Sequence, residues 1–82
     1  MRNGSLVEFV ELVARALVDQ PDRVLVKQAR NERSPRLELS VAPEDIGKVI
    51  GKDGRTAQSI RVLLNVAAAK VGAGKAYLDI LD

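Results

Sequence analysis

The sequence contains neither cysteine nor histidine. Without cysteine there are no disulfides and no thiolate metal sites, and without histidine the commonest general base and a very common zinc ligand are both missing. An enzyme built from this chain would have to rely mainly on Lys, Asp or Glu side chains. We therefore expect a protein that is not an enzyme and that holds no metal and no cofactor.

Aromatic side chains and long apolar runs are also scarce. Phe9 and Tyr77 are the only aromatic residues, and each is expected to contribute to the core rather than to a surface that stacks bases. No apolar run approaches the roughly 18 residues of a membrane span, and the first residues lack the pattern of a secretory signal. These absences predict a cytoplasmic protein that makes no contact with a membrane.

What the chain does contain is enough apolar sequence for one small domain. Hydrophobic residues make up 46% of the chain and charged residues 29%, which is typical of a folded globule rather than of a disordered chain. Residues 1–82 are therefore expected to form a single domain, with residues 1–4 as a disordered N-terminal extension. The sequence shows no internal repeat, no linker and no low-complexity segment.

The first half of the chain predicts one helix followed by two strands. Apolar residues recur at helical intervals over 6–17, after a capping box at 5–8. Residues 24–29 and 37–41 are predicted to form a β-hairpin around a polar turn at 31–35, because both segments are rich in β-branched or alternating apolar residues. The alternation in the second strand places three side chains on its buried face: Leu37, Leu39 and Val41.

The second half predicts two helices separated by a tight turn, and then a closing strand at 75–80. Pro43 and the two acids after it suit the start of a short helix. Gly51 and Gly54 interrupt this helix, and a longer helix begins near Arg55. Its predicted buried stripe consists of Ala57, Ile60, Leu63, Leu64, Ala67, Ala68 and Val71.

Positive charge is concentrated around the glycine turn. Residues 46–75 include six basic residues and one acid, Asp53, so this segment has a net charge of +5 in a chain of net charge +2. Lys48, Lys52 and Arg55 flank or enter the turn. The glycines let another molecule approach the backbone, and the N-terminus of the next helix offers N–H groups and a positive dipole end. Such a turn is suited to bind a phosphate.

The residues from Val49 to Gly54 resemble the Val-Ile-Gly-Lys-x-Gly signature of the KH family of RNA-binding domains. In that family the GXXG loop clamps four backbone nucleotides. The element order α-β-β-α-α-β is also that of the type II KH fold, an α+β domain with a three-stranded sheet and helices on one face. Two further segments, Leu17–Asp22 and Val41–Asp45, make the chain similar to small stand-alone bacterial KH proteins, the KH-domain protein A family.

The resemblance implies a site centred on the turn. In KH domains this loop and the helices beside it face a strand across a groove that holds single-stranded nucleic acid, and Leu39 and Val41 would lie on that strand. Lys52 would contact a phosphate, and the N–H groups of residues 53–56 would donate to phosphate oxygens. The acid in the loop is expected to make the affinity modest and salt-dependent. The implied RNA-binding residues are Gly47, Lys48, Val49, Ile50, Gly51, Lys52, Asp53, Gly54, Arg55 and Thr56.

The same resemblance carries expectations about the biological role. It implies an RNA chaperone or post-transcriptional regulator that self-associates, pairs with a larger KH-domain RNA-binding protein, and has a link to cell elongation, cell shape and envelope homeostasis. Avidity independently favours two copies, since one module of this size covers about four nucleotides. No motif in the sequence identifies the RNA sequence preference, the cellular targets, the dimer surface or the partner.

Two other functions compete with RNA binding. A nucleotide-binding enzyme would need the Walker A pattern, G-x-x-x-x-G-K-[ST], but Gly47 and Gly51 are separated by only three residues and Lys52 is followed by Asp53. The second alternative is a KH-like protein–protein interaction module without direct RNA binding, which would need the glycines only to form the turn. This alternative leaves the basic residues around the turn unexplained. Single-stranded DNA stays an alternative ligand, because only the resemblance favours RNA.

Overall fold

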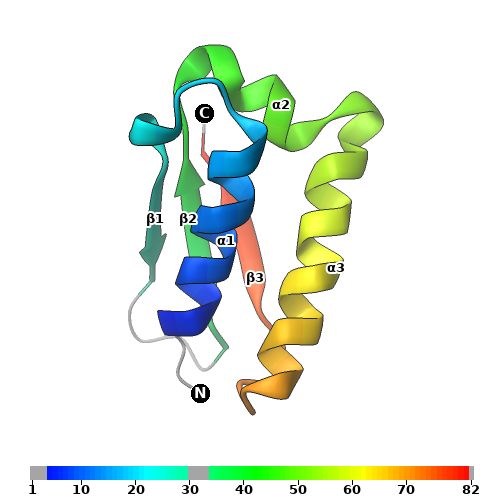
Figure 1. Ribbon diagram of the computed structural model, residues 1–82. Coiled ribbons are helices and arrows are strands. Elements are labelled where there is room, and N and C mark those ends of the chain that lie inside the picture. The colour runs from blue at the N-terminus through cyan, green and yellow to red at the C-terminus, as the bar shows by residue number, and fades with distance from the viewer. Residues whose placement is uncertain (1–3, 30–33, 82) are drawn as a thin grey trace.

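The computed structural model describes residues 4–29 and 34–81 and arranges them as helices packed against one sheet (Figure 1). Short 3₁₀ turns (η) accompany the longer elements, and the predicted order α-β-β-α-α-β is confirmed. None of the described helices is long and apolar enough to cross a membrane. The elements are α1 (Gly4–Leu17), η1 (Pro21–Arg23), β1 (Leu25–Gln28), β2 (Arg36–Ser40), η2 (Pro43–Asp45), α2 (Ile46–Ile50), η3 (Lys52–Gly54), α3 (Arg55–Lys70) and β3 (Tyr77–Ile80).

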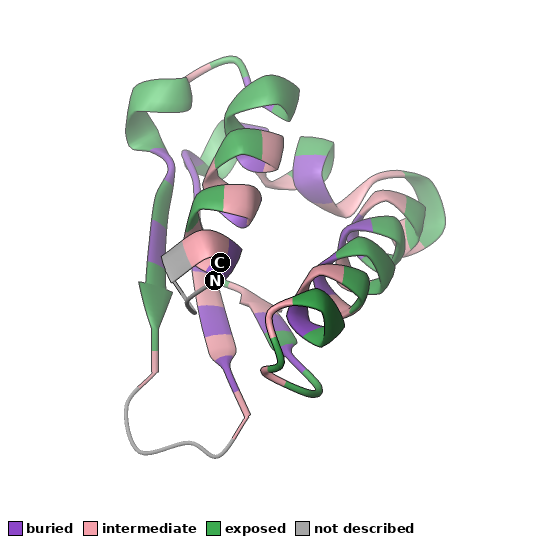
Figure 2. Ribbon diagram, turned by 60° about the horizontal axis from the view of Figure 1, so that its bottom comes forward, coloured by how far each residue is buried: buried purple, intermediate pink, exposed green. Residues whose placement is uncertain are grey.

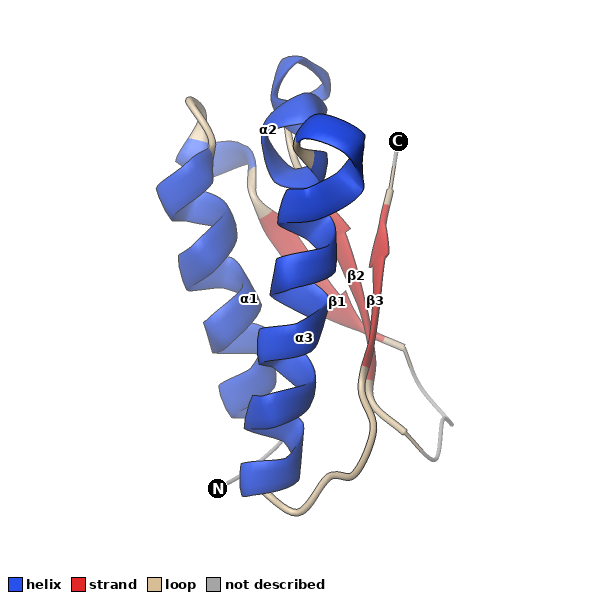
Figure 3. Ribbon diagram, turned by 90° about the vertical axis from the view of Figure 1, so that its right-hand side faces the viewer, coloured by secondary structure: helices blue, strands red, loops and turns tan. Residues whose placement is uncertain are grey.

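A three-stranded mixed sheet in the order β1-β2-β3 forms one layer. β2 pairs with β1 in antiparallel and with β3 in parallel orientation, so that Leu39 lies opposite both Val26 and Ile80. The parallel pair requires a crossover connection, which α2 and α3 provide. In the described part of the chain, α1, α2 and α3 lie on one face of the sheet and no helix covers the opposite face (Figure 3). The predicted α+β fold with helices on one face is confirmed.

The buried residues of the helices and strands lie where these two layers face each other (Figure 2), and they form one apolar core. The predicted alternation in β2 is confirmed, since Leu37, Leu39 and Val41 are all buried, and Phe9 packs against this core as expected. Burial of each large apolar side chain contributes about 1.5–3 kcal/mol. The largest side chains with almost no exposed surface are those of Leu6, Val10, Leu37, Leu39, Val49 and Leu64.

The ends of the first elements differ from the prediction. Helix α1 already includes Gly4, so Ser5 lies inside the first turn and the capping box predicted at 5–8 is wrong. Apart from Gly4, the N-terminal extension predicted for residues 1–4 lies outside the described residues. The same holds for most of the polar turn predicted at 31–35. β1 and β3 are shorter than the predicted 24–29 and 75–80, and β2 begins and ends one residue earlier than the predicted 37–41, because the hydrophobic pattern does not mark the last paired residue.

Two polar side chains of α3 hold the edge strand β3. The amide of Asn65 donates to the carbonyl of Ala76 at 3.0 Å and accepts the N–H of the same residue at 3.0 Å. Two guanidinium nitrogens of Arg61, Nε and Nη2, donate to the carbonyl of Leu78 at 3.2 Å each. The helix and the strand therefore run in opposite directions, and the glycine turn at the start of α3 lies toward the C-terminal end of β3.

The buried carboxylate of Asp45 anchors the short helix α2 to the end of α1. Its side chain is 1% exposed, and one of its oxygens accepts the backbone N–H of Gln20 at 3.0 Å. Lys48, one turn later, lies 3.8 Å from the other oxygen and 3.3 Å from the carboxylate of Asp19. The acids after Pro43 were predicted only to favour the helix dipole, but Asp45 also fixes the position of α2.

Two predicted core residues are exposed. Leu63 was assigned to the buried stripe of α3, yet 53% of it is exposed. Tyr77 was assigned to the core, yet it is 38% exposed and lies on the sheet face that carries no helix, because its neighbours Ala76 and Leu78 point to the helices. Periodicity identified the right elements, but it did not locate the edges of their buried faces.

Candidate nucleic-acid interface

The turn between α2 and α3 has a backbone that few residues adopt. Gly51 has φ 76° and ψ 175°, a combination that is almost restricted to glycine, and Gly54 has φ 74° and ψ 11°. Asp53 lies in the left-handed region with φ 56° and ψ 24°, and it is the only described residue other than glycine with positive φ. Three of the four loop residues therefore have positive φ, and the predicted glycine turn is confirmed as a structural feature.

The two glycines of the turn are required for different reasons. A Cβ atom on Gly51 would lie 2.9 Å from the backbone nitrogen of Thr56 and would also overlap the side chain of that residue. A Cβ atom on Gly54 would meet nothing within 4 Å. Gly51 therefore permits both an unusual conformation and a close approach to α3, whereas Gly54 permits only the conformation.

The backbone donors predicted at residues 53–56 are confirmed as free only in part, at Asp53. Residues 53–56 were expected to donate to phosphate oxygens, but the N–H of Gly54 donates to the carbonyl of Gly51 at 3.1 Å and the N–H of Arg55 donates to the carbonyl of Lys52. Within the described part of the chain, no hydrogen bond uses the N–H of Lys52 or of Asp53. The donors without an internal acceptor are thus at the front of the turn.

Positive charge that is not engaged within the protein is found on the turn itself. Lys52 and Arg55 are exposed, and neither forms an ion pair with any residue in 4–29 or 34–81. By contrast, the charge of Lys48 is balanced by two carboxylates, and Arg61 is bound to the backbone of β3. The segment with net charge +5 therefore presents Lys52 and Arg55 near the turn, with Asp53 exposed between them.

The other residues predicted at the site are divided between its surface and its support. Gly47 is exposed, and Ile50 and Thr56 are partly exposed. Val49 is completely buried, so its side chain supports the turn from the core and presents no surface to a ligand. Leu39 and Val41, which were predicted to lie on the strand that faces the turn across the groove, are also buried. The strand nearest to α3 is β3, not β2.

The sequence can now be compared with known proteins, because both the fold and the turn have been established. A family model described as the KH domain of KhpA/KhpB matches residues 7–80. The chain belongs to this family. The match covers every α-helix and β-strand, apart from the first three residues of α1. The resemblance inferred from the glycine turn and the element order is thereby confirmed.

Curated relatives of similar length carry the same family assignment. The RNA-binding protein KhpA of Caldanaerobacter subterraneus subsp. tengcongensis is 56% identical over 63 residues, which cover 77% of this chain and 84% of the relative. The RNA-binding protein KhpA of Borreliella burgdorferi is 42% identical over 79 residues, which cover 96% and 95% of the two chains. Family membership thus rests on nearly the whole chain rather than on the turn alone.

A solved structure supports the fold. The crystal structure of an Era variant from Aquifex aeolicus superposes with a TM-score of 0.69 over 93% of this chain, at 20% sequence identity. This chain corresponds to 29% of that protein, so the likeness concerns one domain of Era. At this level of identity the comparison establishes the fold and nothing about the ligand.

Proposed function

We propose that this chain binds single-stranded RNA through the turn formed by Gly51, Lys52, Asp53 and Gly54. The observation that carries the proposal is the turn itself, where backbone N–H groups and two cations, all without partners among the described residues, surround a glycine-only conformation. Phosphate is the ligand that such a combination suits. The names of the relatives, RNA-binding protein KhpA, support RNA as the source of that phosphate.

In this proposal each part of the turn has its own task. Gly51 lets the RNA backbone approach, the N–H groups of Lys52 and Asp53 donate to phosphate oxygens, and the side chains of Lys52 and Arg55 supply positive charge. Gly47, Ile50 and Thr56 border the path of the bound RNA. Lys48 and Val49 contribute indirectly, by fixing the position of α2. One module engages about four nucleotides, so the affinity is modest and depends on salt.

The cellular role follows from the family resemblance and belongs to the same proposal. We assign the chain to the cytoplasm, as an RNA chaperone or post-transcriptional regulator without enzymatic activity. It acts as a dimer or together with a larger KH-domain RNA-binding protein, in processes linked to cell elongation and envelope homeostasis. What supports this part is the similarity of the whole chain to small bacterial KH proteins.

Charge reversal at Lys52 tests the proposal. Fluorescence anisotropy with a short single-stranded RNA, recorded over a range of salt concentrations, should show binding by the native chain and its loss in Lys52→Asp. Equal binding by both proteins would move the site away from the turn. Failure of the native chain to bind any RNA would favour a domain that functions only in protein contacts.

Removing the acid from the turn should strengthen binding. Asp53→Asn is expected to raise the affinity for RNA about two- to fivefold at low salt, because one negative charge beside the phosphate path is lost. Asparagine also tolerates positive φ, so the free energy of unfolding should stay within about 0.5 kcal/mol of the native value. Anisotropy and urea denaturation measure the two quantities. Unchanged or lower affinity would contradict the path of RNA over residue 53.

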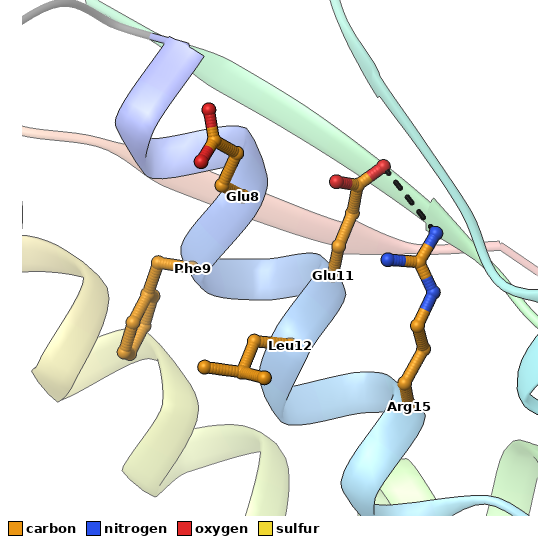
Figure 4. A pocket seen from close by; sticks show the side chains of 5 residues that line it. All are labelled: Glu8, Phe9, Glu11, Leu12 and Arg15. Atoms are coloured by element: carbon orange, nitrogen blue, oxygen red, sulfur yellow. Dashed lines mark ion pairs between the residues drawn. The ribbon is translucent and has the colours of Figure 1, made fainter.

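A second feature supports the dimer, namely an apolar surface on α1 and α3. Leu12 is 70% exposed and Leu63 is 53% exposed, and Val66 is half-exposed as well. Phe9 and Leu12 project from α1 on the side toward α3, away from Glu11 and Arg15 (Figure 4). Leu63 lies on the α1 side of α3, since Arg61 and Asn65, two residues to either side, point to β3.

Charge on this α1–α3 surface is also arranged for a two-fold pairing. On α1, Glu11 is paired with Arg15 and Glu8 is left without a partner among the described residues, while α3 contains no acid between Arg55 and Lys70. A two-fold arrangement in which α1 of one copy meets α3 of the other brings Glu8 toward the basic residues of α3. We therefore place the self-association surface on these two helices.

Substitution of Leu63 should separate self-association from folding. Leu63→Asp is expected to convert the dimer to a monomer in light-scattering measurements, while the midpoint of thermal unfolding at low protein concentration changes little, because the side chain is exposed. Leu25→Asp, on β1 away from both helices and 49% exposed in the native chain, serves as a matched control. A native chain that is monomeric at about 100 μM, or a Leu63→Asp variant that remains dimeric, would contradict this surface.

A further inference from the structure

The face of the sheet opposite the helices carries an exposed aromatic ring that the turn does not use. Tyr77, the first residue of β3, lies directly opposite Arg36, the first residue of β2. Its neighbours Ala76 and Leu78 are buried toward the helices, so the ring of Tyr77 lies on the opposite side of the sheet, which none of the described helices covers, and 38% of the residue is exposed. An aromatic side chain at such a position is available to a ligand as well as to its neighbours.

Two cations lie over this ring. The guanidinium carbon of Arg36 is 4.7 Å and the ammonium nitrogen of Lys75 is 5.3 Å from the ring centroid. Arg36 is held in place by the carboxylate of Asp79, at 3.0 and 3.2 Å. Lys75 forms no ion pair within the described residues, so its charge is available to a second anion. A ring, a guanidinium plane and an ammonium group thus lie together.

This group matches the chemistry of single-stranded nucleic acid. Bases stack on aromatic rings and on guanidinium planes, and lysines contact the phosphates between them. Because Asp79 already balances Arg36, the group offers about one net positive charge, which suits a phosphate of a bound strand better than a free anion. The group is defined here as the Tyr77 site: Arg36, Lys75, Tyr77 and Asp79.

The Tyr77 site is separated from the glycine turn but connected to it by an open edge. Asn65 and Arg61 of α3 bind Ala76 and Leu78, so Tyr77 lies beside the middle of α3, about 9–15 Å along the helix axis from the turn, and its ring faces the other side of the sheet. β3 is an edge strand, so a polymer can pass around it from the helix side to the open face. At about 3.4 Å per stacked nucleotide, four nucleotides span about 14 Å and twelve span about 41 Å. A tetranucleotide held at the turn is too short to pass around β3 as well, whereas the twelve-nucleotide RNA can reach both places.

We propose that the Tyr77 site is a second contact for single-stranded RNA. An RNA that is longer than the turn can hold would stack one of its bases at this site. The proposal rests on RNA binding at the turn, and it adds a reason for longer strands to bind more tightly. Tyr77 provides the stacking surface, Lys75 binds a phosphate, and Asp79 positions Arg36. Shorter RNA binds at the turn and leaves the ring untouched.

The composition of the chain allows a direct test. Tyr77 is the only tyrosine and there is no tryptophan, so the intrinsic fluorescence of the protein reports on this ring alone. A twelve-nucleotide single-stranded RNA is expected to quench this emission in parallel with binding measured by anisotropy. A tetranucleotide should bind without quenching. Free tyrosine amide titrated with the same RNAs corrects for absorption of light by the bases.

Variants then assign the effect to the ring. Tyr77→Leu should bind the twelve-nucleotide RNA about five- to tenfold more weakly and the tetranucleotide as the native chain does, whereas Tyr77→Phe should keep the native affinity for both. Lys75→Gln should weaken binding of the longer RNA more than Lys70→Gln does. Binding of the longer RNA that is neither quenched nor weakened in Tyr77→Leu would overturn the Tyr77 site and leave the turn intact. Failure of both RNAs to bind would overturn the proposed function itself.

Discussion

A Gly51→Ala variant is expected to lose about 2–4 kcal/mol of unfolding free energy, a large part of the total stability of a domain of this size. The methyl group would force a non-glycine residue into a region that costs about 1–3 kcal/mol. It would also lie 2.9 Å from the backbone nitrogen of Thr56, which cannot move without displacing the start of α3. Urea denaturation followed by circular dichroism measures the change.

The second glycine of the turn is the matched control. Gly54 has nearly the same φ as Gly51, 74° against 76°, but a Cβ atom there would meet nothing within 4 Å. Gly54→Ala should therefore cost only about 1–2 kcal/mol, the strain of the left-handed region without a steric overlap. Equal losses in both variants would show that close approach to Thr56 contributes nothing, and that conformation alone explains both glycines.

Charge reversal at Lys52 is expected to lower the affinity for short RNA at least about tenfold at low salt. The variant removes a phosphate contact and places a second carboxylate beside Asp53, so attraction becomes repulsion. The dependence of log Kd on log salt should also become shallower by about 0.7 for each phosphate contact that is lost. Folding should be unaffected, because Lys52 is exposed and forms no ion pair within the described residues.

Comparison with another lysine separates a local contact from the net charge of the chain. Lys52→Gln and Lys70→Gln each remove one positive charge from an exposed position, but Lys70 lies at the other end of α3, about 24 Å from the turn. Only Lys52→Gln should weaken tetranucleotide binding by more than about threefold. Equal effects would indicate general attraction of RNA to a positively charged protein, with no defined site at the turn.

The sequence by itself determined the elements, their order and the turn. Apolar spacing distinguishes helix from strand because the period of each is set by local backbone geometry. The conformation of the turn is likewise local, since Gly51 and Gly54 adopt angles that other residues avoid. The signature around these glycines was therefore sufficient to indicate both the type II KH fold and the candidate site.

The tertiary structure alone decided which charges are available to a ligand. The sequence counted Lys48 and Arg61 among the six basic residues of the segment 46–75. In the folded chain Lys48 is paired with Asp19, 29 positions away, and Arg61 donates to the carbonyl of Leu78, 17 positions away. No local pattern encodes such pairs, because they form between segments brought together by packing. The charge that remains for a phosphate is smaller, and it is located at the turn.

The tertiary structure also decided which apolar side chains are buried. A helix of regular period offers an apolar stripe, but the width of the part that is covered depends on its neighbours, and α1 leaves Leu63 exposed. An alternating strand places Tyr77 opposite to Ala76 and Leu78, and only the position of the helices determines which of the two faces is covered. The surface for self-association and the Tyr77 site both arise from this packing, which involves contacts between residues distant in the chain.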